Sequence, residues 1–293
     1  MTKNPGEKYD LAVAYRIYPK VAKTALGLPL TSNKAQLAEV CLQSFRRSLG
    51  GLRTKIWVLL DGCPPYYADI FRRYFAEDDL TLVPLPAIGN YGTFNRQIEI
   101  LLGQNESEMV YFAEDDYFYL PDQFRFMMDF LQASQDVAFI SPYDHRDSYT
   151  MPLHEVPVLV REYGGHRWKT AASTCLTFLT TRSTLKRTES VFRTYARRNY
   201  DCSMWLSLTK ERVREPWAWP SLAARQPFSW KIISKAWLFG WHQILFGKRQ
   251  RLWTPVPGIA THMDTNALSP GIDWVALMQK EAAALERNAS GPK

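Results

Sequence analysis

The chain has 293 residues, of which 46% are hydrophobic and 22% are charged, and its formal net charge is +7. This length suits one large domain or two small ones, and the composition is that of a globular protein with a sizeable core, which argues against a disordered or fibrous chain. The positive charge favours anionic partners such as phosphorylated ligands, anionic lipid or nucleic acid, without choosing among them.

Cysteine usage and the N-terminus predict a cytoplasmic protein. The four cysteines, Cys41, Cys63, Cys175 and Cys202, form no CxxC pair and have no metal-type spacing, so reduced thiols are expected. The opening residues MTKNPGEKYD lack the apolar segment of a signal peptide. No run of about 20 apolar residues occurs, so no membrane-spanning helix is expected.

Strands and helices alternate along the first two thirds of the sequence. Apolar runs predict buried strands at 10–15, 55–60, 80–83, 109–113 and 137–140. Helical periodicity predicts helices at 34–49, 66–75, 93–102 and 122–131. The first of these helices has cap candidates in Thr31, Ser32 and Asn33 and ends at Gly50-Gly51. This order predicts an α/β fold with a mostly parallel central sheet flanked by helices.

The remaining third is less regular. Residues 141–172 are rich in proline and glycine and are interpreted as loops, with His145, His154 and His166 as surface histidines. A strand is expected at 174–180, and helices are expected at 184–197, 201–211, 228–246 and 273–287. We expect a core at 1–215, a tryptophan-rich basic segment at 216–253, and a C-terminal segment at 254–293 that returns to the active site.

Three consecutive acids interrupt the apolar stretch EMVYFAEDDYFYLPDQF, residues 108–124: Glu114, Asp115 and Asp116. Burying an unpaired carboxylate is costly, so these groups need a proton, a counter-charge or a metal. They follow a predicted strand, as Asp61 does, and ligands of parallel sheets bind at the carboxyl ends of strands. The acids are therefore candidate site residues.

The spacing of the acids indicates a metal, although a plainer interpretation exists. In an extended chain Glu114 and Asp116 point to the same side, and such a carboxylate pair suits a hard divalent cation that it shares with a diphosphate. The alternative is an acidic turn that caps the helix beginning near Asp122. Arg16 or Arg96 could contact phosphates, although a solvated charge is the simpler interpretation of either residue.

Several segments resemble the GT-A nucleotide-sugar glycosyltransferases, in particular inverting, family-two-like bacterial members. The stretch VYFAEDDYFYLPDQF is similar to their D-x-D segment, KIWVLLDG to their second strand, and IGNYGTFNRQIEIL to the turn and helix before the D-x-D strand. Further on, TAASTCLTFLTTRSTL, RNYDCSMWLSL and PVPGIATHMD are similar to their acceptor-side strand, catalytic helix start and late metal ligand. The resemblance implies a GT-A (Rossmann-like) fold, with a helical and aromatic C-terminal extension in this chain.

The resemblance also implies a role for each candidate residue. Nucleotide and donor binding would fall to Asp61, Asn95, Glu114 and Asp115. A manganese or magnesium ion would be held by Glu114, Asp116 and His262. The general base would be Asp201. The chain departs from the family pattern in its Glu at the first acid and in YDC, where an ED pair is usual.

These roles describe a metal-dependent glycosyltransferase, inverting through Asp201, that moves a sugar from a nucleoside-diphosphate donor to a hydroxyl. The acceptor would be a glycan or a lipid-linked molecule in glycan, lipopolysaccharide or glycolipid assembly. Two alternatives remain: a metal-dependent nucleotidyltransferase, and a non-catalytic membrane-associated protein on a transferase fold.

The segment 228–251 is basic and aromatic. On a helix, Lys231, Ser234, Lys235 and His242 share a face that lies away from most of the tryptophans. Such a helix suits an anionic membrane surface, here the inner face of the plasma membrane, but it could equally pack its apolar side on the core. No nucleic-acid motif is present, so nucleic acid is not expected as a partner.

Overall fold

The computed structural model describes residues 8–20 and 33–289. The cap candidates Thr31 and Ser32 lie outside these residues, as does most of the polar N-terminus. The third candidate, Asn33, accepts hydrogen bonds from the backbone of Ala35 and Gln36 and begins helix α1, Lys34–Leu49.

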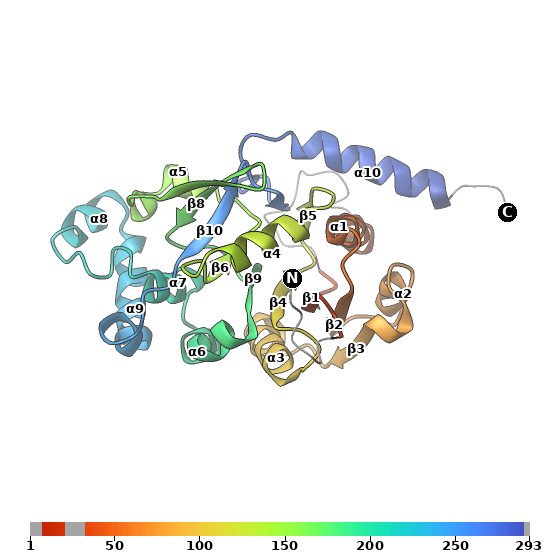
Figure 1. Cartoon of the computed structure of the whole chain (residues 1–293), viewed down its shortest axis with the longest axis horizontal. Coiled ribbons are helices and arrows are strands. Elements are labelled where there is room, and N and C mark those ends of the chain that lie inside the picture. The colour runs from red at the N-terminus through yellow and green to blue at the C-terminus, as the bar shows by residue number, and fades with distance from the viewer. Residues whose placement is uncertain (1–7, 21–32, 290–293) are drawn as a thin grey trace.

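A nine-stranded sheet of order β3-β2-β1-β4-β9-β6-β10-β8-β7 forms the centre of the molecule (Figure 1). Its strands are β1 Leu11–Ile17, β2 Thr54–Asp61, β3 Leu80–Leu85, β4 Met109–Glu114, β6 Phe139–Ile140, β7 Val160–Tyr163, β8 His166–Ala171, β9 Phe178–Thr181 and β10 Leu252–Val256. A second sheet pairs β5, Tyr117–Tyr119, with β11, Ala260–His262.

The sheet has a parallel half and a mixed half. Strands β3, β2, β1 and β4 are all parallel to one another. Beyond β4, β9 runs antiparallel to both β4 and β6, and β8 runs antiparallel to β10 and β7. The predicted α/β fold is therefore confirmed, and its parallel character belongs to the N-terminal half.

Helices cover both faces of the sheet. The remaining α-helices are α2 Tyr66–Arg72, α3 Gly89–Gly103, α4 Phe124–Ala133, α5 Asp147–Thr150, α6 Arg182–Phe192, α7 Asp201–Thr209, α8 Trp219–Arg225, α9 Phe228–Leu245 and α10 Trp274–Ala289. Short 3-10 turns occur at Glu77–Asp79, Pro152–His154 and Arg193–Arg197.

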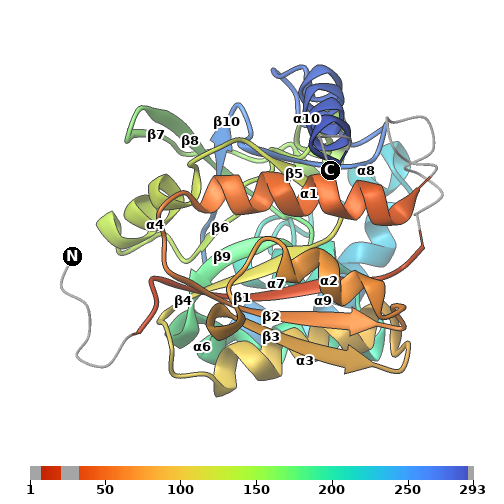
Figure 2. The ribbon, with the colours of Figure 1, turned by 90° about the vertical axis from the view of Figure 1, so that its right-hand side faces the viewer.

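Strand β1 shows how alternation builds the two layers. Leu11, Val13 and Tyr15 join the cluster that contains residues of α1, α2 and α4. Ala12 and Ala14 join the opposite cluster, which contains residues of α3, α6 and α7. Successive strand side chains point to opposite faces, so one wholly buried strand serves both layers. Figure 2 shows α1 on one side of the sheet and α3 on the other.

The expectation of loops over 141–172 is wrong, because this stretch contains the β7–β8 hairpin. Gly164 and Gly165 form its turn at φ 59° and 78°, a region that favours glycine. Trp168 in β8 is fully buried and stacks on Phe130 at 4.3 Å between ring centroids. The hairpin carries many charged residues, since only one of its faces is covered, and this obscured its strand pattern.

Two further boundaries differ from expectation. Helix α3 begins at Gly89, inside the predicted turn, because the Asp61 carboxylate accepts from the backbone N–H groups of Ile88 and Gly89 at 2.7 and 2.8 Å. The predicted segment boundary at residue 253 falls inside β10, a strand in the interior of the main sheet.

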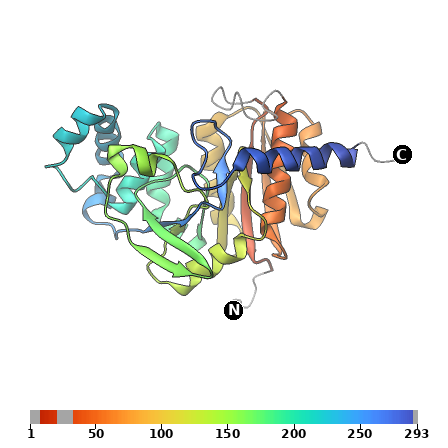
Figure 3. The ribbon, with the colours of Figure 1, turned by 90° about the horizontal axis from the view of Figure 1, so that it is seen from above.

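Helices α8 and α9 lie together at one end of the molecule, far from the C-terminal end of α10 (Figure 3). Ile232, Ile233, Ala236 and Ile244 of α9 are buried in a cluster with Leu206 of α7. In the described part of the chain, no helix is long and apolar enough to cross a membrane.

Candidate active site

A cavity of about 410 Å³ opens at the carboxyl ends of the parallel strands. Its lining comes from the ends of β1, β2 and β4 and from the first turns of α1 and α3. The chain passes from β1 to β2 and β3 on one side and then returns to place β4 on the other side of β1. The cavity thus lies where the strand order reverses, which is the usual ligand position in open α/β sheets.

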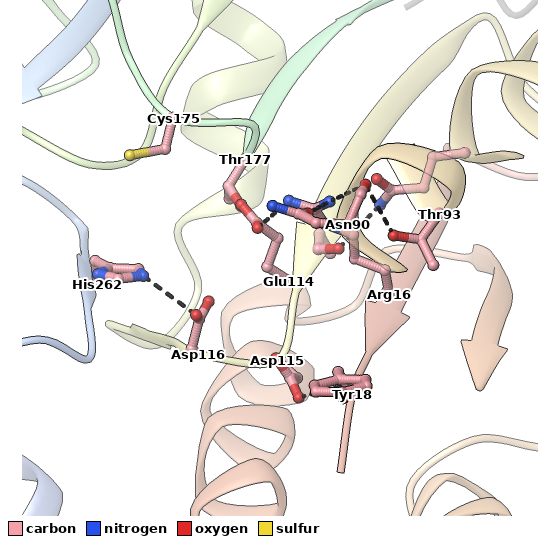
Figure 4. A network of polar contacts seen from close by, with 12 residues as sticks. Arg16, Tyr18, Asn90, Thr93, Glu114, Asp115, Asp116, Cys175, Thr177 and His262 are labelled. Carbon is pink, nitrogen blue, oxygen red and sulfur yellow. Dashed lines mark hydrogen bonds and ion pairs between the residues drawn. The ribbon is translucent and has the colours of Figure 1, made fainter. Parts of the chain in front are cut away.

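The three acids at the end of β4 each meet a different cation. Figure 4 shows Glu114 beside Arg16 and Asp116 beside His262. Glu114 accepts from the guanidinium of Arg16 in β1 and, at 2.8 Å, from the hydroxyl of Thr177. Arg16 is buried and also donates to Asn90. Burial acts to lower the pKa of Arg16, but the charge and hydrogen bond of Glu114, together with Tyr195 and Asp116, raise it overall. Arg16 is therefore a buried, charged partner, and its interpretation as a solvated charge is wrong.

Asp115 pairs with Lys34 at the start of α1. Its carboxylate lies 2.7 Å from the Lys34 ammonium and accepts from the backbone of Tyr18 at 3.3 Å. Burial raises the pKa of Asp115, and the charge of Lys34 only partly opposes this effect. The pairing ties the end of β4 to the segment that follows β1.

Asp116 pairs with His262 of β11 across 3.2 Å between Oδ2 and Nε2. Burial acts to lower the pKa of His262, but the charge and hydrogen bond of Asp116 raise it to about 9. For Asp116, burial acts to raise the pKa, but the charge of His262 holds it below its usual range. The pair is therefore ionic at neutral pH. The other Asp116 oxygen, Oδ1, is buried without a hydrogen-bond partner.

The predicted three-residue metal site is not assembled. Across residues 8–20 and 33–289, no three or more His, Cys, Asp or Glu side chains converge where they could hold a metal ion. Glu114 is excluded from such a set because Arg16 and Thr177 occupy its carboxylate. Asp116 still fits a cation, since its Oδ1 is an orphaned oxygen and magnesium or manganese takes many of its ligands from phosphate and water. His262 would join it as a ligand only after its imidazole loses the proton that the Asp116 pairing favours.

Two predicted donor-binding residues differ in their placement. Asp61 lines the cavity, although its carboxylate oxygens already hold the start of α3. Asn95 does not line the cavity: it contacts Glu99 and Arg193 on the outer side of α3. Five positions correspond to about 140° of helical rotation, so Asn90 occupies the cavity face instead.

Asp201 begins α7, outside the residues that line the cavity, and interacts electrostatically with Glu114. Its carboxylate accepts from the backbone of Cys202 at 2.7 Å. Burial raises the pKa of Asp201, and the negative charge of Glu114 adds to this effect while Arg16 opposes it. Asp201 is thus within electrostatic range of Glu114 and Arg16, and its environment favours a carboxyl group that accepts a proton readily.

The sequence indicated Arg16 only as a possible phosphate contact, and it gave no signal for Lys34, Asn90 or Thr177. Arg16 and Lys34 are single bases beside predicted elements, and only the buried acids indicate that partners are needed. His145 was expected at the surface but is half-buried near His262; burial lowers its pKa, and the charge of Asp147 opposes this effect. His154 is also half-buried rather than a surface group, whereas Arg96 is exposed and pairs with Glu99.

The sequence matches no family model and no curated protein. Among solved structures, it is similar to the galactosyltransferase LgtC in complex with donor and acceptor sugar analogs, at 9% identity and a TM-score of 0.43, covering 96% of this chain and 100% of that one. It is also similar to 4-diphosphocytidyl-2C-methyl-D-erythritol synthase, at 11% identity and a TM-score of 0.39, covering 70% and 87%. Likenesses this distant decide neither a reaction nor a substrate.

Proposed function

We propose that the chain is a glycosyltransferase that uses a nucleoside-diphosphate sugar. The observation that carries this proposal is the cavity at the strand-order reversal, where Glu114, Asp115 and Asp116 meet Arg16, Lys34 and His262. Such a rim supplies both polar groups for a sugar and nucleoside and positive charge for a diphosphate.

The diphosphate would bind beside Lys20, which is exposed at the cavity rim, and Lys34. Arg16, Lys34 and His262 are already held by carboxylates, so they would meet a phosphate in fixed positions. Preorganised charge of this kind stabilises the negative charge that develops on a leaving diphosphate. A divalent cation held by Asp116, and by His262 once its imidazole has lost the proton, would supply further positive charge to that leaving group.

Asp201 would act as the general base. Inversion requires one carboxylate on the face opposite the leaving group, positioned to take the proton of the acceptor hydroxyl. The burial of Asp201 supports this role, because a carboxylate with a raised pKa accepts a proton more readily. Asp115, held by Lys34, would contact the ribose or the sugar.

The acceptor in this proposal is a glycan or a lipid-linked hydroxyl, and the reaction takes place in the cytoplasm. The four cysteines are all free thiols, which supports a reducing compartment.

A nucleotidyltransferase is the second candidate, because the same acids and cations could hold a nucleoside triphosphate. The two reactions release different products. We would incubate the protein with nucleoside-diphosphate sugars and, separately, with nucleoside triphosphates plus sugar phosphates, and analyse the products by chromatography. Release of a nucleoside diphosphate from a sugar donor supports the glycosyltransferase, whereas release of pyrophosphate from a triphosphate overturns it in favour of the second candidate.

A further inference from the structure

Helix α9 is apolar on two faces, and only one of them is covered by the protein. Ile232, Ile233, Ala236, Gly240 and Ile244 are buried and form the inner stripe. Trp230, Leu238, Trp241 and Leu245 form a second, outer stripe, with exposed fractions of 51%, 70%, 43% and 48%. At 100° per residue the outer stripe spans about 80° of the helix surface, so these four side chains make one continuous strip.

The ends of this helix extend the exposed apolar surface. Phe228 at the first residue and Phe246 just after the last are 48% and 77% exposed. Trp241 and Phe246 contact each other at 6.5 Å between ring centroids. Tryptophan, phenylalanine and leucine together on a solvent-facing helix are unusual for a soluble surface and mark an interaction site.

The charge of the same region identifies its partner. Residues 216–253 contain six basic residues and no acidic residue. Arg225, Arg249 and Arg251 pair with Glu155, Glu211 and Asp136 of other segments. Lys231 and Lys248 are exposed at the two ends of the outer stripe, and Lys231 lies beside it on the helix. A strip of large apolar groups bordered by cations matches the interface of a bilayer that contains anionic lipid.

The N-terminal part of α9 lies next to the residue that precedes the candidate base. Phe228 contacts the ring of Tyr200 at 5.4 Å, and the ammonium of Lys235 lies 3.8 Å from the centroid of the same ring. Tyr200 directly precedes Asp201, so helix α9, which carries the outer stripe, also contacts the start of helix α7.

We propose that the outer stripe of α9 lies in the interface of an anionic membrane, through Trp230, Leu238, Trp241 and Leu245 with Lys231 and Lys248. This contact would orient the first residue of α7, Asp201, toward that membrane. The membrane contact stands on the exposed side chains alone. The further consequence, that a lipid-linked acceptor reaches Asp201 from this side, rests on the proposed function.

The test is sedimentation of the full chain with vesicles of phosphatidylcholine, with or without about one third phosphatidylserine. We expect strong binding only to the anionic vesicles. Leu238→Ser with Trp241→Ser should reduce the bound fraction at least tenfold, and Lys231→Glu with Lys248→Glu should reduce it by a similar factor. Val160→Ser is the matched control, because Val160 is 55% exposed in β7 at the edge of the sheet, and it should bind as the unaltered chain does.

Three other results would overturn the proposed membrane contact. Absence of binding to anionic vesicles, or equal binding by the Leu238/Trp241 variant, overturns the proposal. A dimer in light scattering that the same variant dissolves also overturns it, in favour of a second copy as the occupant. The melting-temperature shift with nucleoside diphosphates should be the same in all these variants, so a failure of the proposed function is recognised separately.

Discussion

The acids after β4 and the outer stripe of α9 both place side chains against their usual preference, but the chain compensates for only one of them. Glu114, Asp115 and Asp116 are carboxylates in a largely buried setting, and each is matched by a cation from another element. The apolar side chains of the outer stripe face solvent. Matched charges indicate a site preorganised for a polar ligand, whereas exposed aromatic groups indicate a surface completed by a partner.

The largest expected effect is on turnover, and it comes from Asp201, a carboxylate that belongs to none of these three ion pairs. Asp201→Asn should reduce turnover by about a hundredfold to ten-thousandfold while nucleotide binding is retained, because only proton transfer is removed. Steady-state rates and calorimetric nucleotide titration check both halves. Turnover at the normal rate would exclude Asp201 as the base.

Breaking one matched pair should destabilise the protein strongly. Arg16→Met leaves the Glu114 carboxylate partly buried without its cation, and the free energy of unfolding should fall by about 3–5 kcal/mol. Adding Glu114→Gln should restore much of this loss, since the unpaired charge is then gone. Urea unfolding of both single variants and the double variant measures the coupling; additive losses would show that the pair is not a unit.

His154 provides the contrast of a half-buried histidine that stays neutral. Burial lowers its pKa to about 4, with the charge of Asp147 opposing the effect, and its Nδ1 is buried without a partner. An unfolded histidine titrates near 6.5, so the contribution is present above pH 6.5 and is lost as the pH falls through 4. We expect about 3 kcal/mol of acid destabilisation from this residue. His154→Leu should flatten the stability profile between pH 6.5 and 4, and an unchanged profile would contradict the assignment.

The two faces of α9 should respond differently to small changes. Gly240→Ala would place a methyl group 2.3 Å from the Ser207 hydroxyl of α7, so stability should fall by about 1–3 kcal/mol. Leu238→Ser, on the outer stripe, should change it by less than about 0.5 kcal/mol. Melting curves of the two variants measure the difference. A large loss for Leu238→Ser would mean that the outer stripe is covered within the folded chain.

The parallel strands and the acids could be predicted from the sequence, whereas the contacts that the acids make with distant segments could not. The parallel strands are predictable because they are buried on both faces and appear as continuous apolar runs, as β1 and β4 do. The acids are predictable as site residues because they break such a run. The pairing of each acid with its cation is not predictable, because Arg16, Lys34 and His262 are brought together only by tertiary packing across 246 residues, from β1 to β11.

The other differences between the sequence predictions and the structure also have identifiable structural causes. Hairpin β7–β8 carries charges on its uncovered face, so its alternation is weak. Asn95 was assigned to donor binding through the family resemblance alone, and the start of α3, which puts Asn90 on the cavity face, depends on a distant cap, the Asp61 carboxylate. For α9, the sequence offered core packing or membrane contact as alternatives, and the structure buries one apolar stripe while exposing another.

The central claim is that the paired acids form a nucleoside-diphosphate site. The most direct measurement is the melting temperature of the unaltered chain and of Asp116→Ala with UDP, GDP, dTDP or CMP, each with manganese and with EDTA. At a hundredfold excess over the dissociation constant, one nucleotide should stabilise the unaltered chain by about 2.7 kcal/mol, and the shift should vanish in EDTA and in Asp116→Ala. The absence of a shift with every nucleotide, or an equal shift in Asp116→Ala, would contradict the claim.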